Sequence, residues 1–115
     1  MKNEQTVING SGEQTRDYVF VQDIVKANIL ALGKTDFNIY NIGTEKETTI
    51  NYIFGKLNEY AGSSFKEVHG PAKKGEQMRS SLSYSRIKNE LGWNPGTGIE
   101  EGLKSTLEFF KNRIK

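Results

Sequence analysis

The residues best suited to hold a ligand lie around a glycine-rich loop near the start of the sequence. The loop, Gly10-Ser11-Gly12, follows a short β-favouring run and precedes Arg16. Glycine lets the backbone approach a ligand closely, and a guanidinium can donate paired hydrogen bonds to a phosphate. A surface turn in which Arg16 pairs with its neighbour Asp17 explains the same residues. From these residues alone we favour the surface turn.

A second group of cations occurs much later in the chain. Lys73, Lys74 and Arg79 fall within seven residues, and a glycine interrupts them. Together with Arg16 they would complete a clamp for a pyrophosphate, because several cations converge on one anion. Taken by itself, this segment is more typical of a solvated loop, which is the interpretation the residues alone favour.

Other residues suggest catalysis only weakly. The spacing Tyr-x-x-x-Lys occurs twice, at Tyr52 with Lys56 and at Tyr84 with Lys88. On a helix this spacing lets the lysine lower the pKa of the phenol, so that the phenolate acts as a base. The chain has five tyrosines and many lysines, so we interpret both matches as coincidences. His69 is the single histidine, and a lone histidine beside a Gly-Pro turn is more often structural or merely exposed than catalytic.

The composition limits the classes of protein to which the chain can belong. Its 115 residues suffice for one domain, residues 1–115, and its net charge of +2 comes from scattered charges. We therefore expect no nucleic-acid partner. No apolar run approaches the ~20 residues that cross a bilayer, so we expect no membrane partner either. The absence of cysteine excludes disulfides and thiolate zinc sites and fits a cytoplasmic location.

The pattern of apolar residues predicts a small α/β (α+β) domain of about three short strands and four helices. The strands are expected at residues 6–8, 18–21 and 37–42, and a further one is possible at 65–69. We expect Asp23 to cap a helix over residues 24–32 that is buried on more than one face. Thr48 or Thr49 should cap the clearest helix, whose apolar stripe runs from residue 50 to 61 and which ends at Gly62. The remaining helices are predicted at 83–91 and from residue 99 onward, with residues 72–80 as a loop; the apolar face of the last helix would comprise Ile99, Leu103, Leu107, Phe110 and Ile114.

Five blocks, in order, resemble the C-terminal third of the UDP-glucose 4-epimerases, which are extended short-chain dehydrogenase/reductases. The first block contains Q-T-R-D-Y-V at residues 14–19, and a later one contains E-L-G-W-N-P at residues 90–95. All five blocks follow the family's order, at residues 6–21, 39–44, 71–76, 85–95 and 100–103. The resemblance implies the substrate-binding part of such an enzyme, without its Rossmann half.

The resemblance also implies residues for a nucleotide-sugar site. In that family the arginine of the first motif and a basic residue of a later one hold the UDP phosphates, and these correspond to Arg16 and Lys73. The acidic residue that contacts the ribose corresponds to Glu76. A lysine stands where the family has an arginine, so the phosphate contact changes from a planar fork to a point charge.

The base and sugar ends of the site follow by the same resemblance. The segment that passes the uracil corresponds to Ile8 and Asn9, and Ser80 corresponds to a residue in the wall of the sugar pocket. In having a small residue at this position, the chain resembles family members that accept N-acetylated sugars. The sequence departs from the family at Ser11, which replaces an aspartate, and at residues 83–84, which replace Asp-Pro.

The parent family uses NAD, but no cofactor is expected in this chain. No Gly-x-x-Gly-x-x-Gly follows a strand, so the pyrophosphate of a dinucleotide has no helix N-terminus to bind. We therefore expect a chain that binds a UDP-sugar and does not epimerise it alone. Its partner would be a separate dinucleotide-binding chain, or a second copy in self-association.

Two other interpretations remain open. In one, the chain is a non-enzymatic module that self-associates or binds a partner through the apolar helix at 24–32. In the other, the parent enzyme is a sugar-nucleotide dehydratase or decarboxylase of the same superfamily, because the C-terminal third does not define the reaction.

Overall fold

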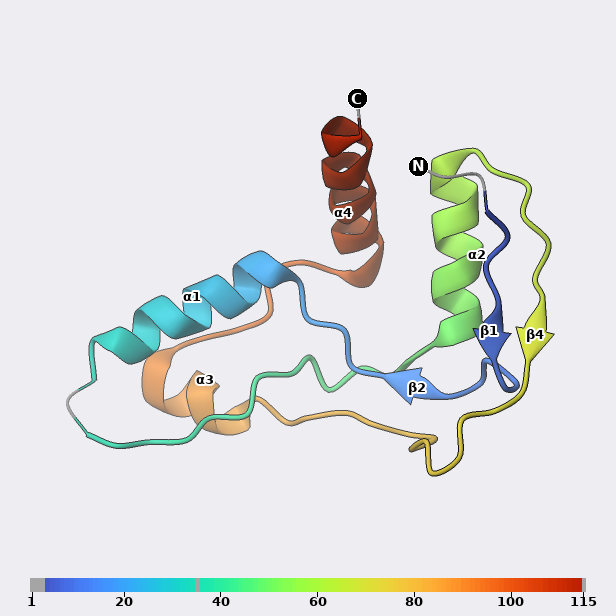
Figure 1. Cartoon of the computed structure of the whole chain (residues 1–115). Helices are drawn as coiled ribbons and strands as arrows, with labels where there is room; N and C mark the ends of the chain where they lie inside the picture. The colour runs from blue at the N-terminus through green and yellow to red at the C-terminus, as the bar shows by residue number, and fades with distance from the viewer. Residues whose placement is uncertain (1–3, 35, 115) are drawn as a thin grey trace.

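The computed structural model describes residues 4–34 and 36–114. These residues form four helices and four two-residue strands in a flat molecule of 49 × 37 × 18 Å (Figure 1). The order is β1 (Ile8–Asn9), β2 (Thr15–Arg16), α1 (Val21–Leu32), β3 (Thr48–Thr49), α2 (Ile50–Ala61), β4 (His69–Gly70), α3 (Ser85–Leu91) and α4 (Ile99–Arg113). The small mixed α/β domain with four helices is confirmed.

The strands form two separate pairs. β1 lies parallel to β4, and β2 lies antiparallel to β3. The strands predicted at residues 18–21 and 37–42 are wrong. The first segment is irregular up to the start of α1 at Val21, and the second is irregular throughout. Strand propensity needs a neighbouring strand to take effect, and no strand of the described chain pairs with either segment.

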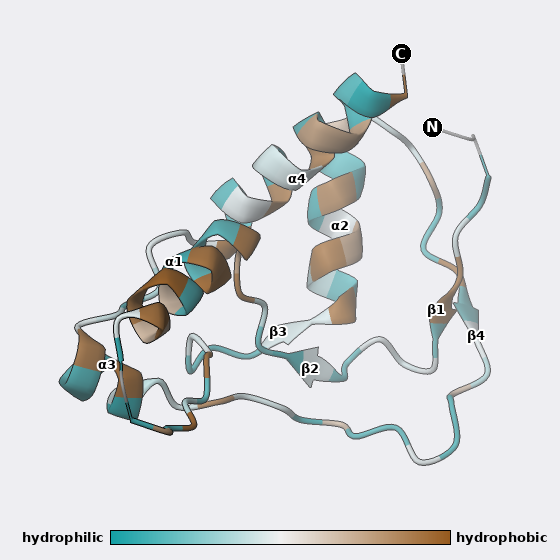
Figure 2. Ribbon diagram, turned by 60° about the vertical axis from the view of Figure 1, so that its left-hand side comes forward, coloured by the Kyte–Doolittle hydropathy of each residue, from teal (hydrophilic) through white to brown (hydrophobic). Residues whose placement is uncertain are grey.

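Helix α2 agrees with its prediction at both ends. The Thr49 hydroxyl accepts the backbone N–H of Tyr52 at 3.1 Å, and Gly62 ends the helix in the left-handed conformation, with φ of 63°. α2 packs beside α4, as Figures 1 and 2 both show. The Tyr52 hydroxyl joins the two helices by donating to the Glu100 carboxylate at 2.7 Å.

Helix α1 differs from its prediction in two ways. It begins at Val21, so Asp23 lies inside the first turn and caps nothing at the start of the helix. The Asp23 carboxylate is buried and accepts the backbone N–H groups of Gly96 and Thr97, at 3.1 and 3.0 Å. The expected burial on more than one face is also wrong, because Ile29 is 62% exposed. Figure 2 shows how much of this helix is apolar.

The core lies between α1 and α3. Ala27, Ile87 and Trp93 are buried there, and Tyr84 packs edge-on against Trp93 with ring centres 5.8 Å apart. The Trp93 indole N–H donates to the Asp23 carbonyl at 2.9 Å, which fixes the segment after α3 to α1. The predicted inward face of α4 is confirmed only in part. Ile99, Leu103 and Leu107 are half-buried, whereas Phe110 and Ile114 are exposed.

Among the residues described, the structure contains no helix long and apolar enough to cross a membrane.

Candidate functional site

The β1–β4 pair places the glycine loop beside the start of the loop at residues 72–80. Asn9 is opposite Gly70, and the Gly10 N–H donates to the Gly70 carbonyl at 3.0 Å. Gly10 has a φ of 71°, and a β-carbon on it would lie 3.1 Å from the Ala72 side chain. The two segments that the sequence suggested as anion sites therefore meet, although some sixty residues separate them.

β2 holds the 72–80 loop through successive residues. The Thr15 N–H donates to the Met78 carbonyl at 2.8 Å, and Arg16 Nη1 donates to the Gln77 carbonyl at 2.8 Å. The Thr15 hydroxyl and the Arg79 guanidinium share the Glu47 carboxylate, at 2.6 and 3.1 Å. Arg79 and then Thr15 lower the pKa of Glu47 to about 2. Strand and loop thus form one unit.

Arg16 pairs with Glu76 across this unit. Arg16 Nη2 lies 3.4 Å from Glu76 Oε1, and the two side chains are 32% and 26% exposed. The local pair expected between Arg16 and Asp17 is wrong. Asp17 instead accepts the backbone N–H groups of Thr44 and Leu82, because it points to the opposite side of the extended chain.

A small cavity is lined by three of the six predicted site residues. It has a volume of about 280 Å³ and lies between β1 and α2. Ile8, Asn9 and Glu76 line it, together with residues of α2. Arg16 forms an ion pair with Glu76 but does not itself line the cavity. Lys73 and Ser80 belong to the same loop but do not line this cavity; Lys73 is exposed and Ser80 is half-buried.

Gln14 is a member of this cluster that the sequence prediction missed. Its side chain is buried, and its amide donates to the Asn9 carbonyl at 2.9 Å and to Glu76 Oε2 at 3.4 Å. One signal in the sequence points to it. Side chains at alternate positions of an extended chain share a face, so Gln14 lies on the same side as Arg16.

The two Tyr-x-x-x-Lys matches have structural contacts. The hydrogen bond to Glu100 raises the pKa of Tyr52, which is opposite to what a phenolate base requires. The Lys56 ammonium lies 5.9 Å from the centre of the Tyr52 ring. Tyr84 packs on Trp93 in the core. The interpretation of both spacings as coincidences agrees with these contacts.

His69 lies against the glycine loop. Its Nδ1 is 2.7 Å from the Gly10 carbonyl oxygen and its Nε2 is 2.7 Å from a Glu67 carboxylate oxygen. Glu67 and then Gly10 raise the pKa of the imidazole. Both neighbours are acceptors, so the protonated ring, with two N–H donors, satisfies both at once.

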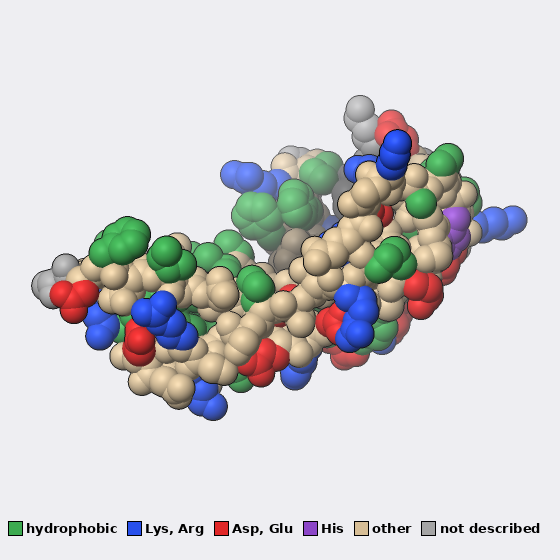
Figure 3. All heavy atoms as spheres, turned by 90° about the horizontal axis from the view of Figure 1, so that it is seen from below, with side chains coloured by type: hydrophobic (Ala, Val, Ile, Leu, Met, Phe, Trp, Pro, Cys, Tyr) green, Lys and Arg blue, Asp and Glu red, His purple; other side chains and the backbone are tan. Residues whose placement is uncertain are grey.

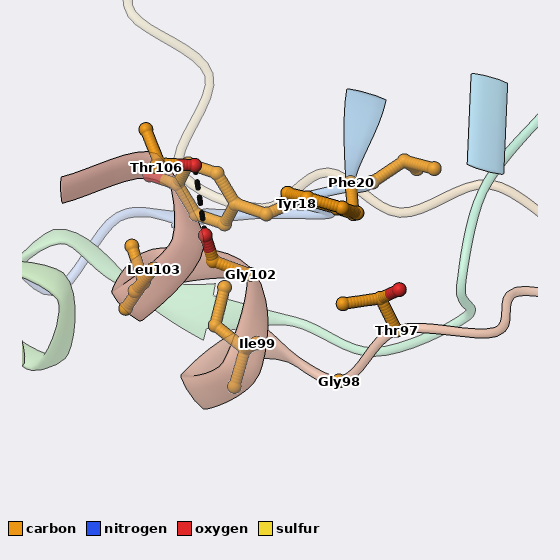
Figure 4. Close-up of a pocket in the computed structure, with 9 residues that line it drawn as sticks. Tyr18, Phe20, Thr97, Gly98, Ile99, Gly102, Leu103 and Thr106 are labelled. Atoms are coloured by element: carbon orange, nitrogen blue, oxygen red, sulfur yellow. Dashed lines mark hydrogen bonds between the residues drawn. The ribbon is translucent and has the colours of Figure 1, made fainter. Parts of the chain in front are cut away.

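A second cavity of about 210 Å³ lies between α4 and the segment that leads into α1 (Figure 4). Tyr18, Phe20, Ile99 and Leu103 make it largely apolar, and Gly102 allows Phe20 to approach α4. Partial burial raises the pKa of Tyr18. The residues that the sequence suggested for the site do not line it.

The fold matches part of a solved enzyme. The crystal structure of a UDP-glucose 4-epimerase with UDP-glucose, from Thermotoga maritima, superposes with a TM-score of 0.92 at 44% sequence identity. The match covers 97% of this chain and 36% of that one. The α/β arrangement is thus that of one part of an extended short-chain dehydrogenase/reductase.

Curated relatives give the same result. A UDP-glucose 4-epimerase of Mycolicibacterium smegmatis is 36% identical over 109 residues, covering 94% of this chain and 35% of that protein. A dTDP-glucose 4,6-dehydratase of Haemophilus influenzae is 35% identical over 117 residues, covering 90% and 34%. The family described as GDP-mannose 4,6 dehydratase matches residues 1–106. The chain belongs to this epimerase and dehydratase family, and it spans about a third of the length of these relatives.

Proposed function

We propose that this chain binds the nucleotide of a UDP-sugar and does not catalyse a reaction alone. Arg16 and Lys73 hold the diphosphate, Glu76 accepts hydroxyl groups of the ribose, Ile8 and Asn9 line the base, and Ser80 adjoins the sugar. The observation that carries the proposal is the contact between Arg16 and Glu76, which joins β2 to the 72–80 loop.

The guanidinium of Arg16 is oriented before a ligand arrives. Nη1 donates to the carbonyl oxygens of Thr15 and Gln77, at 2.6 and 2.8 Å, and Nη2 faces Glu76. A guanidinium has five N–H groups, so Nε and one hydrogen of Nη2 are left for phosphate oxygens. Fixing the donor in advance reduces the entropy lost on binding. Lys73, exposed on the adjoining loop, adds a second positive charge.

The residues of the glycine loop do not fit the pyrophosphate of NAD. In the described chain the loop leads into β2 and not into the N-terminus of a helix. The space beside Gly12, which has a φ of 73°, is filled by Asn51, whose amide donates to the Ser11 carbonyl at 3.0 Å. These residues therefore offer no place for the dinucleotide that a hydride transfer requires. In the parent reaction class, the dinucleotide supplies that chemistry.

We propose ligand binding alone, and not the reaction of the parent enzyme. An epimerase and a dehydratase are both among the relatives, and both names refer to sugars carried on a nucleoside diphosphate. Binding of that diphosphate is what the residues of this chain can supply.

Calorimetric titration of UDP into the wild type and into Arg16→Ala tests this proposal. Loss of a charge-assisted contact should weaken binding by at least about tenfold. Arg113→Ala is the matched control, because Arg113 lies at the end of α4 and stacks on Phe109. Equal UDP affinities for the wild type and Arg16→Ala would contradict the site.

A second candidate function is self-association, and one observation favours it. Val21, Val25, Ile29 and Leu32 follow one another along α1 and are 65%, 48%, 62% and 84% exposed. Hydrophobic side chains also reach the surface elsewhere, as Figure 3 shows for one face. Contiguous apolar surface of this kind commonly marks an interface. A second copy, or a separate dinucleotide-binding chain, would cover this face.

A further inference from the structure

We infer that Gln14 is a positioning residue that sets the relative placement of the base and ribose ends of the nucleotide site. The inference rests on the proposed function, because it assigns a role within that same site. It starts from the burial of Gln14, which is 4% exposed although its side chain is polar. A buried amide costs free energy unless it is hydrogen-bonded, so its partners indicate what it is for.

Both partners of the Gln14 amide belong to the proposed site. Nε2 lies 2.9 Å from the Asn9 carbonyl oxygen and 3.4 Å from Glu76 Oε2. A carbonyl and a carboxylate oxygen can only accept, so the group that faces them must be the NH₂ of the amide. One side chain therefore bridges the segment assigned to the uracil and the carboxylate assigned to the ribose.

The hydrogen bond from Gln14 also helps to fix the orientation of the Glu76 carboxylate. Arg16 holds Oε1 and Gln14 holds Oε2, each at 3.4 Å, so the carboxylate plane is fixed by two donors from the same strand segment. The backbone of Gln14 is itself anchored, because its carbonyl accepts the N–H of Ile50 at 3.2 Å. Helix α2, β1 and the 72–80 loop thus meet at one residue, and Gln14 lines the cavity between them.

Because of its position, Gln14 should affect the nucleoside and the diphosphate of the ligand differently. The diphosphate contacts of Arg16 and Lys73 do not pass through Gln14, because Arg16 is also held by the carbonyl oxygens of Thr15 and Gln77. The ribose contact of Glu76 does depend on Gln14. A change at Gln14 should therefore weaken binding of a nucleoside diphosphate more than binding of a bare diphosphate.

The test compares UDP with inorganic pyrophosphate, titrated calorimetrically into the wild type and Gln14→Met. Methionine keeps the length of the side chain and removes both hydrogen bonds. UDP affinity should fall by about tenfold, as for a hydrogen bond to a charged group, while pyrophosphate affinity changes less than twofold. Arg16→Ala is the contrasting variant and should weaken both ligands.

The outcomes distinguish the inference from the proposed function. Equal loss of both ligands in Gln14→Met, or loss of neither, overturns the role of Gln14 while the site remains. Failure of the wild type to bind UDP overturns the proposed function, and the inference with it. If Gln14→Met does not fold, Gln14→Glu replaces it; that variant keeps the size and polarity but repels Glu76, so the same selective loss of UDP is expected.

Discussion

The guanidinium of Arg16 lies 3.4 Å from the Glu76 carboxylate, although 60 positions separate the two residues in the sequence. This contact joins the strand after the glycine loop to the loop that carries Lys73 and Ser80. It is only partly shielded from water, so we attribute little stability to it. Its importance is geometric, because it places a cation beside a carboxylate that lines one small cavity.

Asp17 should be among the most important polar residues for stability. Its carboxylate accepts the N–H groups of Thr44, Glu45 and Leu82, and it also accepts the Thr44 hydroxyl. Asp17→Ala leaves these donors unpaired, which should lower the free energy of unfolding by about 2–4 kcal/mol. Urea denaturation followed by the emission of Trp93 measures this. Asp36→Ala, at an exposed aspartate, is the control and should change stability by less than about 0.5 kcal/mol; similar values for both variants would refute the role of Asp17.

His69 should make stability depend on pH near neutrality. Its pKa in the folded chain is raised above 6.5 by Glu67 and the Gly10 carbonyl. The stabilising contribution is complete below the pKa of the unfolded chain and is lost as the pH rises through the folded pKa. The thermal midpoint of the wild type should therefore fall between about pH 6 and 8, relative to that of His69→Gln. Parallel pH profiles for the two proteins would show that the imidazolium contacts contribute nothing.

Glu47 should show the opposite dependence, at acid pH. Its pKa in the folded chain is about 2, lowered from 4.5 by Arg79 and then by Thr15. The contribution is present above the unfolded value and is lost as the pH falls through about 2. The carboxyl carbon shift of Glu47 should thus titrate near pH 2 in the wild type. In Arg79→Ala its midpoint should move up toward 4.5; an unmoved midpoint would rule out the ion pair as the main cause.

Self-association through α1 can be tested on its exposed face. Ile29 is 62% exposed, and Ile29→Glu places a charge in the middle of the apolar stripe. If two copies pack through this face, the sedimentation coefficient of the wild type rises with concentration and that of Ile29→Glu does not. Asn28→Glu introduces the same charge change on an exposed neighbouring position and should behave like the wild type. A wild type that sediments as a monomer at every concentration would remove this candidate function.

The elements that the sequence predicted well are those whose signals are local. Thr49, the apolar stripe and Gly62 define the beginning, face and end of α2 within one stretch of chain, and the structure reproduces all three. Gly92 likewise ends α3 in the left-handed conformation, with φ of 72°. Such signals work because capping and helical periodicity need no distant partner.

The errors arise where a distant residue decides the outcome. Asp23 has the character of a helix cap, but its carboxylate bonds the backbone at Gly96 and Thr97, more than seventy positions away. The Asp17 carboxylate likewise accepts the backbone N–H groups of Thr44 and Leu82 and does not pair with its neighbour Arg16. The cluster of Arg16, Glu76 and Gln14 depends on the pairing of β1 with β4, which no local pattern could indicate. The family motifs pointed to the first two of these residues, and they included Gln14 without giving it a role.

The most direct test of the nucleotide-binding site is a titration of the isolated chain with UDP and UDP-glucose, followed by its amide chemical shifts. The account predicts saturable shifts that cluster at residues 8–16 and 73–80, where β1, β2 and the 72–80 loop meet. The absence of shifts at millimolar ligand, or shifts that cluster on α1 and α4 instead, would contradict it.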